Sequence, residues 1–257
     1  MRKILFTTVN GMLKPFKGRG LSQTKVGKFV YEKVFVPNKP NYVEVEGFKL
    51  YIHKGKDLLS DSLLIEHQYE PLETTIIKEL VQEGDIVVDA GANIGYYTVL
   101  LSKIVGHKGK VYAFEPDEEC FNLLKRNCKE NKCYNVVLIN KALSEKEGKV
   151  KFYVDEKDRA SSSILDGSIG QKVIVQATTL DKEVSEPVAL MKMDIEGAEL
   201  QGLKGGSRLL ESCEKMVIEV PEKRKDFQDI KKLLIKSKYE IKRLDEGNIL
   251  CTKGGKK

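Results

Sequence analysis

The chain has 257 residues, of which 41% are hydrophobic and 32% are charged. This length allows one domain with a full core plus an N-terminal extension, and the composition excludes a disordered chain. The formal net charge is +6, from 44 basic and 38 acidic residues. Such a modest excess is compatible with an anionic partner but does not require one.

Five cysteines are spread along the chain, at positions 120, 128, 133, 213 and 251. They form no C-x-x-C pair and have no histidine at ligand spacing, so a structural zinc site is not expected. Cys120 and Cys128 are eight residues apart on a predicted helix and therefore fall on one face. We expect buried thiols rather than a disulfide-built secreted fold.

The N-terminal sequence does not match an export signal. The apolar run after Arg2 and Lys3 is too short, and no small-residue cleavage site follows it. No stretch approaches the roughly 20 apolar residues that a membrane-spanning helix needs. We therefore expect a cytoplasmic protein without a transmembrane segment.

Residues 1–64 differ in character from the rest and are predicted to be an N-terminal extension, a possible cover for an acceptor site. A short amphipathic stretch near Val26–Val34 predicts a short helix, and residues 42–54 alternate around Gly47, which predicts a hairpin. The segment 71–80 then carries apolar residues at helical spacing. Pro71 suits the first turn of that helix.

From Gly84 onward strands and helices alternate. Strands are predicted at 86–89, 110–114, 135–143, 148–154, 173–180, 188–194 and 214–220, with a terminal hairpin at 239–253; helices are predicted at 94–105, 116–132, 198–212 and 221–238. The order predicts an α/β fold with a doubly wound, mostly parallel sheet and an antiparallel C-terminal hairpin. The polar loop 155–170 is either a substrate lid or an exposed connection.

Four acidic residues lie at or near the carboxyl ends of predicted strands: Asp89, Glu115, Asp194 and Glu219. A single acid after a strand is often only a helix cap. In open α/β sheets, however, the carboxyl ends of the strands meet at the edge where ligands bind, so these four would form one acidic rim. Such a rim suits a ligand with hydroxyls and positive charge, and it does not suit a pyrophosphate.

The turn "DAGANIG" after the first of these strands agrees with this interpretation. It lacks the third glycine of a dinucleotide-binding G-x-G-x-x-G turn. Gly91 would let the backbone approach a ligand, and Gly95 would allow close packing at the helix start. Asp89 would repel a pyrophosphate but attract an amino group. Glu115 ends the next strand, where a carboxylate can accept two hydrogen bonds from ribose hydroxyls.

The sequence resembles a class I S-adenosylmethionine-dependent methyltransferase, and more narrowly the FkbM family. The segments "VVDAGANIGYYTVLLS" and "AFEPDEECFNLLKRN" resemble the first two cofactor blocks of that family. "NKALSEKEGKVKFYV" and "LMKMDIEGAELQGLKG" resemble the later blocks, and "YEP" resembles the segment that leads into the domain. The resemblance covers roughly residues 65–220 and implies a seven-stranded Rossmann-like methyltransferase domain over residues 65–257.

The resemblance also implies site residues. Asp89 to Gly95 would hold the methionine part of S-adenosyl-L-methionine, Glu115 the ribose, and Asn140 to Ala142 would lie near the adenine. The complete predicted cofactor-binding set is Glu70, Asp89, Gly91, Ala92, Asn93, Gly95, Tyr96, Glu115, Pro116, Asn140, Ala142 and Asp194.

Asp194 and Glu196 are the predicted catalytic residues. An alcohol acceptor loses a proton when it is methylated, so a base near the methyl group assists the reaction. The alternatives are that Asp194 binds the cofactor amine and that Glu196 caps the helix after it. Asp194, Glu196 and Glu219 offer oxygen ligands suited to Mg²⁺, but their spacing is not diagnostic and we predict no metal site. His67 is more simply an ordinary structural histidine than an acceptor-pocket residue.

The sequence therefore predicts a methyltransferase that acts on a hydroxyl oxygen of a small molecule, sugar or glycan. Methylation of RNA or protein is the alternative, motivated by the net charge and the Lys-rich N-terminal segment. A scaffold that binds the cofactor without catalysis is the non-enzymatic alternative. A nicotinamide oxidoreductase is disfavoured by the glycine pattern. The acceptor and the oligomeric state are not readable from the sequence.

Overall fold

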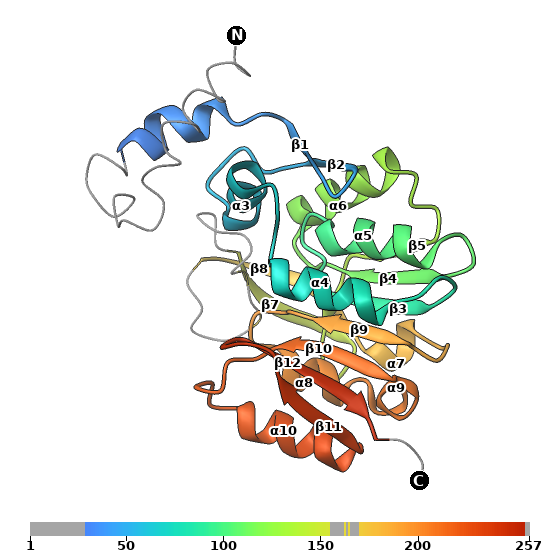
Figure 1. Cartoon of the computed structure of the whole chain (residues 1–257). Helices are drawn as coiled ribbons and strands as arrows, with labels where there is room; N and C mark the ends of the chain where they lie inside the picture. Colours follow the sequence, from blue (N-terminus) through green and yellow to red (C-terminus); the bar gives the residue numbers. More distant parts are fainter. Residues whose placement is uncertain (1–28, 155–161, 163, 165–169, 255–257) are drawn as a thin grey trace.

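A computed structural model describes residues 29–154, 162, 164 and 170–254. Seven described strands form one sheet in the order β11-β12-β10-β9-β3-β4-β5 (Figure 1). Their bounds are Ile86–Ala90 (β3), Lys110–Phe114 (β4), Val136–Ile139 (β5), Leu190–Met193 (β9), Lys215–Glu219 (β10), Tyr239–Arg243 (β11) and Asn248–Lys253 (β12). Strands β10, β9, β3, β4 and β5 are parallel neighbours, whereas β12 runs antiparallel to both β10 and β11. The predicted sheet with its antiparallel C-terminal hairpin is confirmed.

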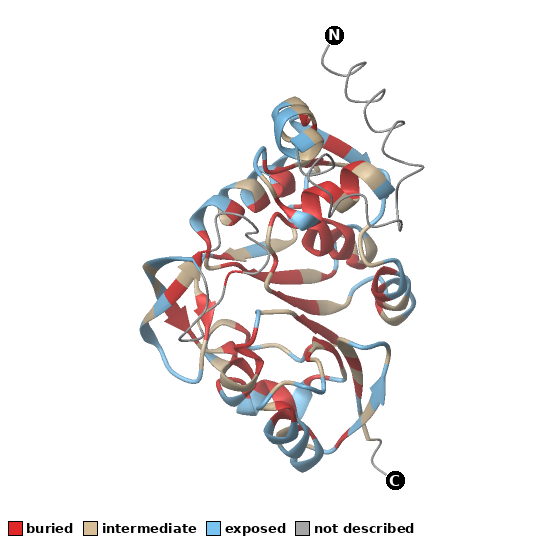
Figure 2. Cartoon of the chain, turned by 90° about the vertical axis from the view of Figure 1, so that its left-hand side faces the viewer, coloured by how far each residue is buried: buried red, intermediate tan, exposed pale blue. Residues whose placement is uncertain are grey.

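Helices cover both faces of this sheet. One core joins it to α4 (Pro71–Leu80), α5 (Tyr96–Val105) and α6 (Glu118–Glu130). The other joins it to α7 (Leu180–Glu183), α8 (Glu199–Lys204), α9 (Ser207–Ser212) and α10 (Phe227–Lys236). Val87 belongs to the first core and Val88 to the second, because successive strand residues point to opposite faces. Figure 2 shows buried residues concentrated on the central strands and the helix faces that meet them.

The N-terminal hairpin of β1 (Tyr42–Val45) and β2 (Phe48–Tyr51) packs on α6. Its turn has positive φ at Glu46 (52°) and Gly47 (73°), as a tight hairpin turn requires. The side chain of Asn127 on α6 accepts a hydrogen bond from the Tyr51 N–H at 2.7 Å and donates to the Tyr51 carbonyl oxygen at 3.0 Å. The hairpin thus shares the first core, and the domain division at residue 64 stays a prediction.

The segments beside the hairpin only partly match the sequence analysis. The predicted helix near Val26–Val34 begins outside the described residues, and its described end continues into η3 (Tyr31–Phe35) and η4 (Val36–Asn38). An additional helix, α3 (Leu58–Glu66), was not predicted. It is capped by Asp57, whose carboxylate accepts a hydrogen bond from the Ser60 N–H at 2.8 Å.

Two predicted elements are each divided into two. The strand 135–143 is two strands, β5 and β6 (Ala142–Leu143). Strand β6 joins β7 (Gly148–Val154) and β8 (Gln171–Thr178) in a separate three-stranded sheet. The helix 198–212 is broken between α8 and α9, where a side chain on Gly205 would place its Cβ 2.1 Å from the Ser144 carbonyl oxygen. The close passage of the 144 loop therefore requires glycine there.

The predicted lid or connection can be followed only in small part. Most of the predicted lid or connection at 155–170 lies outside the described residues, which include only Ser162, Ile164 and Gly170 of that stretch.

Each of the described helices is too short or too polar to cross a bilayer. All five cysteines are free and buried, as expected.

Gly91 lies where the ends of β3 and β9 come close to each other. Its φ is +88°, and a Cβ built on it would lie 1.7 Å from the carbonyl oxygen of Asp194. The sequence analysis assigned this glycine to the approach of a ligand. In the structure the atom that a side chain would strike belongs to the chain itself, so Gly91 lets two strand ends meet at the sheet edge.

We expect Gly91→Ala to lower the free energy of unfolding by roughly 3 kcal/mol or more, because the added methyl forces the β3 and β9 ends apart. The matched control is Gly84→Ala, at a φ of +92° with no atom within 4 Å of the added Cβ. Backbone strain alone costs roughly 1 kcal/mol there. Urea denaturation of both variants checks this, and equal losses would contradict a role for the contact.

Candidate active-site cleft

A cleft lies at the carboxyl edge of the parallel strands. It encloses about 1100 Å³ of empty space, part of which is open to solvent. Its wall includes residues that follow β3, β4 and β9 and the last residue of β10, together with the segment before α4. The predicted site residues that line it are Glu70, Gly91, Ala92, Asn93, Tyr96, Glu115, Pro116, Ala142, Asp194 and Glu196. The tertiary fold thus brings together residues that are up to 126 positions apart in sequence, from Glu70 to Glu196.

Asp89 is a predicted site residue that does not line the cleft. It is fully buried behind the strand end, where one of its oxygens accepts a hydrogen bond from the Thr98 hydroxyl at 2.5 Å. Its other oxygen has no hydrogen-bond partner within the part of the chain that the structure describes. Burial raises the pKa of Asp89, opposed by the charge of Lys192 and by Thr98. Asp89 therefore lies behind the described cleft wall, and its predicted contact with the cofactor stays a prediction.

Gly95 and Asn140 also lie outside the cleft wall. Gly95 has a φ of +92°, and a Cβ there would lie 2.6 Å from Leu124 Cδ1, so its role is the close helix packing that was one of its predicted functions. The Asn140 amide donates hydrogen bonds to the carbonyl oxygens of Glu115 at 2.8 Å and Pro116 at 3.3 Å. Asn140 therefore shapes the turn after β4, while its neighbour Ala142 reaches the cleft.

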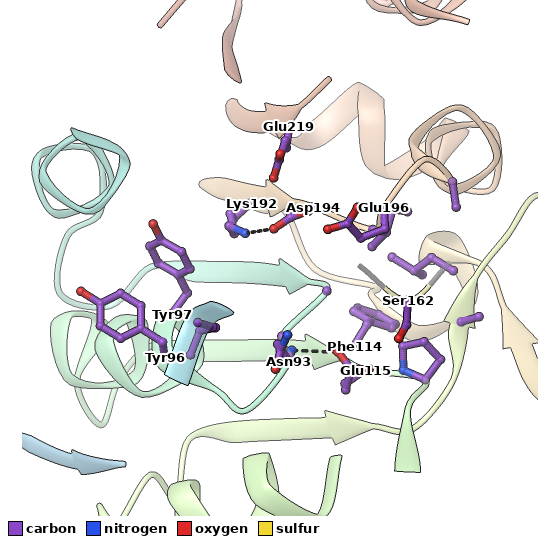
Figure 3. A pocket seen from close by; sticks show the side chains of 18 of the residues that line it. Asn93, Tyr96, Tyr97, Phe114, Glu115, Ser162, Lys192, Asp194, Glu196 and Glu219 are labelled. Carbon is purple, nitrogen blue, oxygen red and sulfur yellow. Dashed lines mark hydrogen bonds and ion pairs between the residues drawn. The ribbon is translucent and has the colours of Figure 1, made fainter. Parts of the chain in front are cut away.

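Glu115 follows β4 and forms the middle of the cleft. One carboxylate oxygen accepts the Asn93 N–H and the other accepts the Asp117 N–H, each at 2.8 Å (Figure 3). Asn93 can present that N–H because it adopts a left-handed φ of 49°. Burial raises the pKa of Glu115 to about 8, although the two N–H groups oppose the shift. The carboxyl group is thus fixed in orientation.

Lys192 lies at the base of the cleft and is 3% exposed. Its ammonium nitrogen is 3.0 Å from Asp194 Oδ2 and 3.9 Å from Glu73 Oε1, and it lies 4.8 Å from the centre of the Tyr97 ring. Burial alone would lower the pKa of Lys192, but the surrounding carboxylates raise it well above its ordinary value. The lysine is therefore a fixed positive charge rather than a base.

Acidic groups around Lys192 outnumber the charge that it can balance. Glu73 on α4 is 4% exposed, and burial raises its pKa to about 8 against the opposing effect of Lys192. Glu219 at the end of β10 points toward Asp194 (Figure 3). Burial, followed by the charge of Asp194, raises the pKa of Glu219 to about 9. Part of this cluster therefore holds protons at neutral pH.

Tyrosines close the cleft near α4 and α5. The Tyr97 hydroxyl donates a hydrogen bond to Glu70 Oε2 at 3.0 Å, and Glu70 is held in a left-handed conformation at the start of α4. Tyr69, Tyr96 and Tyr97 meet edge to face, with ring centres 5.1 to 6.2 Å apart. Pairs with this geometry stabilise a rigid wall.

The loop after β9 carries Glu196 and is held from behind. Glu199 is 1% exposed, and its Oε1 accepts hydrogen bonds from the Ile195 and Gly197 N–H groups, each at 3.1 Å. The Arg224 guanidinium pairs with the other Glu199 oxygen and donates to the Gly197 carbonyl oxygen at 3.0 Å. Glu196 itself adopts a φ of 50°. The position before α8 is occupied by Ala198, so the alternative that Glu196 caps this helix is not observed.

Comparisons with known sequences and structures show which proteins this chain is similar to. The sequence profile described as "Methyltransferase FkbM domain" matches residues 89–241. The chain belongs to the FkbM methyltransferase family. The chain is similar to the "Hexuronic acid methyltransferase AglP" of Haloferax volcanii, with 29% identity over 175 residues that cover 66% of this chain and 70% of that protein.

Two further similarities are more distant. The "tRNA (adenine(58)-N(1))-methyltransferase catalytic subunit TRM61" of Yarrowia lipolytica is 30% identical over 132 residues, covering 47% of this chain and 32% of that protein. The crystal structure of a methyltransferase FkbM from Methylobacillus flagellatus KT superposes with a TM-score of 0.52 at 18% identity, covering 76% of this chain and 52% of that one. This chain thus spans about half the length of that structure, which supports the fold alone.

The sequence analysis missed several residues that face or support the cleft. Lys192, Tyr69, Tyr97 and Ser162 line it, and Glu73 and Glu199 lie behind. Lys192 precedes Asp194 by two positions, so on an extended strand both side chains point to the same side. That spacing was a usable signal for Lys192. Glu73 lies on a helix and gave no such signal.

Two alternatives from the sequence analysis can be compared with the structure. His67 is exposed at the end of α3 and is not part of the cleft wall, consistent with an ordinary structural role. Among the described residues, His, Cys, Asp and Glu side chains form no group of three or more arranged to hold a metal ion.

Glu219→Gln is expected to change how stability depends on pH. The folded-state pKa of Glu219 is about 9 and its ordinary value is 4.5. Folded protein therefore holds a proton that the unfolded chain releases above pH 4.5, so stability is lost as pH rises toward 9. A glutamine imitates the protonated acid and removes this loss.

As the pH rises from 5.5 to 8, the free energy of unfolding of Glu219→Gln should increase relative to that of the wild type by roughly 1–2 kcal/mol, after allowance for solvent screening. Urea denaturation of the ligand-free protein at both values measures it. Glu222→Gln, at an exposed position beyond β10, is the control and should show no pH-dependent gain. A parallel pH response of wild type and Glu219→Gln would show that Glu219 ionises normally.

Proposed function

We propose that the chain is an S-adenosyl-L-methionine-dependent methyltransferase that methylates a hydroxyl oxygen of a small molecule or sugar. The observation that carries the proposal is the row of acidic groups across the strand ends. Glu115 follows β4, Asp194 follows β9, and the glycine turn of β3 lies between them. Membership of the FkbM family supports methyl transfer as the reaction.

The strand order suggests how a nucleoside would lie. Ala142 and Lys141 line the cleft beside β5, and we assign them to the adenine. Glu115 is next along the edge and suits the ribose, because a carboxylate can accept one hydrogen bond from each of the two ribose hydroxyls. The turn from Gly91 to Asn93 and the Asp194 carboxylate come next, and we assign them to the methionine part. Neighbouring strands are about 4.8 Å apart, so this row extends over the length of a nucleoside.

The charge of the cleft fits this ligand. Five acidic residues line it, Glu70, Glu115, Asp194, Glu196 and Glu219, against the two cations Lys141 and Lys192 among its described residues. Lys141 is already paired with Glu183 at 2.7 Å, and Lys192 with Asp194. A ligand of positive charge would be attracted, and a pyrophosphate repelled. When bound, S-adenosyl-L-methionine supplies a methyl group on a positively charged sulfur.

The residues of the chain would then orient the acceptor and remove its proton. Asp194 and Glu196 face the cleft beside the proposed methionine position (Figure 3). Holding an acceptor oxygen in line with the methyl group provides much of the acceleration in a displacement of this kind. A carboxylate within hydrogen-bonding reach accepts the hydroxyl proton. We assign this role to Asp194, with binding of the cofactor amine as the alternative for the same group.

A sugar or small-molecule acceptor is favoured over RNA. The relative from Haloferax volcanii is named for a hexuronic acid, and we infer a related class of hydroxylated acceptor here. RNA binding depends chiefly on cations that contact phosphates. The described rim of this cleft is acidic, and the lysines of a second groove, including Lys103, Lys108 and Lys132, lie at the opposite edge of the sheet.

Glu115→Ala should weaken binding of S-adenosylhomocysteine by about 1–3 kcal/mol, the scale of lost hydrogen bonds to a charged group. Isothermal titration calorimetry measures the affinity, with NAD as a negative control ligand. Glu118→Ala, three residues further on and exposed, is the matched control and should bind as the wild type does. Unchanged affinity of Glu115→Ala would remove its ribose role, and no binding to wild type would refute the cofactor.

Asp194→Asn should reduce turnover by about 10²-fold or more while changing cofactor affinity much less, if Asp194 is the base. Transfer of labelled methyl groups to a panel of hydroxylated sugars gives the rate, and calorimetry gives the affinity. Equal losses in both would assign Asp194 to the cofactor amine instead.

A further inference from the structure

Glu219 is a cleft residue to which no role has yet been assigned. It is the last residue of β10, the strand next to β9, and its carboxyl group points toward Asp194 from across the strand boundary (Figure 3). If both carboxyl groups were charged they would repel each other, because like charges on neighbouring groups interact strongly in a partly buried site. Lys192 contacts Asp194 directly and Glu219 less closely.

The surroundings of this pair contain more acids than bases. Groups that act on Asp194, Glu219 or Lys192 come from each packed element: Glu196 from the loop after β9, Glu70 and Glu73 from the start of α4, Tyr69 from the segment before it, Tyr97 from α5, and Asp89 from β3. On β12 the residue opposite Glu219 is the uncharged Asn248. Lys192 alone supplies positive charge among these described groups.

We propose that Glu219, whose carboxyl group points toward Asp194, holds one proton in the ligand-free protein and releases it when a cationic methyl donor binds, and that this carboxyl pair accepts the proton of the acceptor hydroxyl during transfer. This inference rests on the proposed function and adds Glu219 to the residues that act in it. The pair can exchange a proton because one negative charge is balanced by Lys192 and the second has no cation until the ligand supplies one.

The proton balance of the cycle closes. Before binding, the pair carries one proton and one negative charge. The arriving positive charge favours two carboxylates, and the proton leaves to solvent. During transfer the acceptor oxygen bonds to the methyl carbon, the carbon–sulfur bond breaks with its electron pair remaining on sulfur, and the hydroxyl proton moves to the pair. The product sulfur is neutral, so the pair again holds one proton, as it does without ligand.

The titration behaviour of the cluster is consistent with this geometry. Burial and the adjacent Asp194 raise the pKa of Glu219 to about 9, so Glu219 is mostly protonated at pH 7.5. A ribose bound at Glu115 would also alter proton binding there, since burial raises the pKa of Glu115 to about 8. That second effect is common to S-adenosylmethionine and S-adenosylhomocysteine. The difference between the two ligands therefore isolates the effect of the sulfur charge.

The test measures the protons exchanged on binding by the full-length protein. S-adenosylmethionine and S-adenosylhomocysteine are each titrated at pH 7.5 in phosphate, HEPES and Tris, whose ionisation enthalpies differ. The dependence of the observed heat on the buffer gives the number of protons released. We expect S-adenosylmethionine to release about 0.5 to 1 proton more than S-adenosylhomocysteine. In Glu219→Gln this difference should fall to about zero, whereas Glu222→Gln should retain it.

A second measurement uses only the wild-type protein, so it does not depend on the folding of a variant. The ratio of the affinities for S-adenosylmethionine and S-adenosylhomocysteine should rise roughly 3- to 10-fold per pH unit between pH 7 and 8.5. Equal proton release for the two ligands, a pH-independent ratio, or a difference that persists in Glu219→Gln would overturn the carboxyl pair. Absence of binding by both ligands would instead refute the proposed cofactor site, so the two failures are distinguishable.

Discussion

The parallel pairing of β3 with both β4 and β9 is the constraint on which the cleft depends. In this register Ala90 lies opposite Phe114 on one side and Met193 on the other, so the three strands end at the same level. Parallel strands present all their carboxyl ends at one edge, and the residues that follow them meet there. Glu115 and Asp194 are brought to one cleft by this alignment.

The glycine turn after β3 adapts the backbone to that alignment. Gly91, Asn93 and Gly95 all have positive φ, and each serves a different neighbour. Gly91 leaves room for the Asp194 carbonyl, Asn93 turns its N–H toward Glu115, and Gly95 leaves room for Leu124. One short turn therefore links β9, β4 and α6, and the ligand-facing groups gain fixed positions from contacts within the chain.

Electrostatic imbalance is the second property of the cleft. Burying carboxyl groups without partners is unfavourable, and it is relieved either by protonation or by a counter-charge. Lys192 provides one counter-charge to Asp194 and Glu73. The remaining acids hold protons or face the open cleft. A site of this composition accepts a cation more readily than an anion, and the proposed ligand is a cation.

The sequence by itself determined the strand and helix alternation, the glycine turn, and the acids that follow the strands. These are local features: a continuous apolar strand, a turn that needs glycine and a carboxylate after a strand are each readable within about ten residues. The same locality explains the errors. The predicted helix 198–212 is broken at Gly205, where the Ser144 carbonyl oxygen passes close to the backbone, and no residue near Gly205 in sequence signals that contact.

Only the tertiary structure decided which acids act together and which remain outside the cleft. Asp89 and Glu115 looked equivalent after their strands, but Asp89 is sealed behind the sheet edge by Thr98 whereas Glu115 faces the cleft. Glu73 meets Lys192 across 119 positions of sequence, and Glu219 meets Asp194 because β10 pairs with β9. Charge interactions of this kind depend on distance and burial in space, and both are set by strand order and helix packing rather than by neighbouring residues.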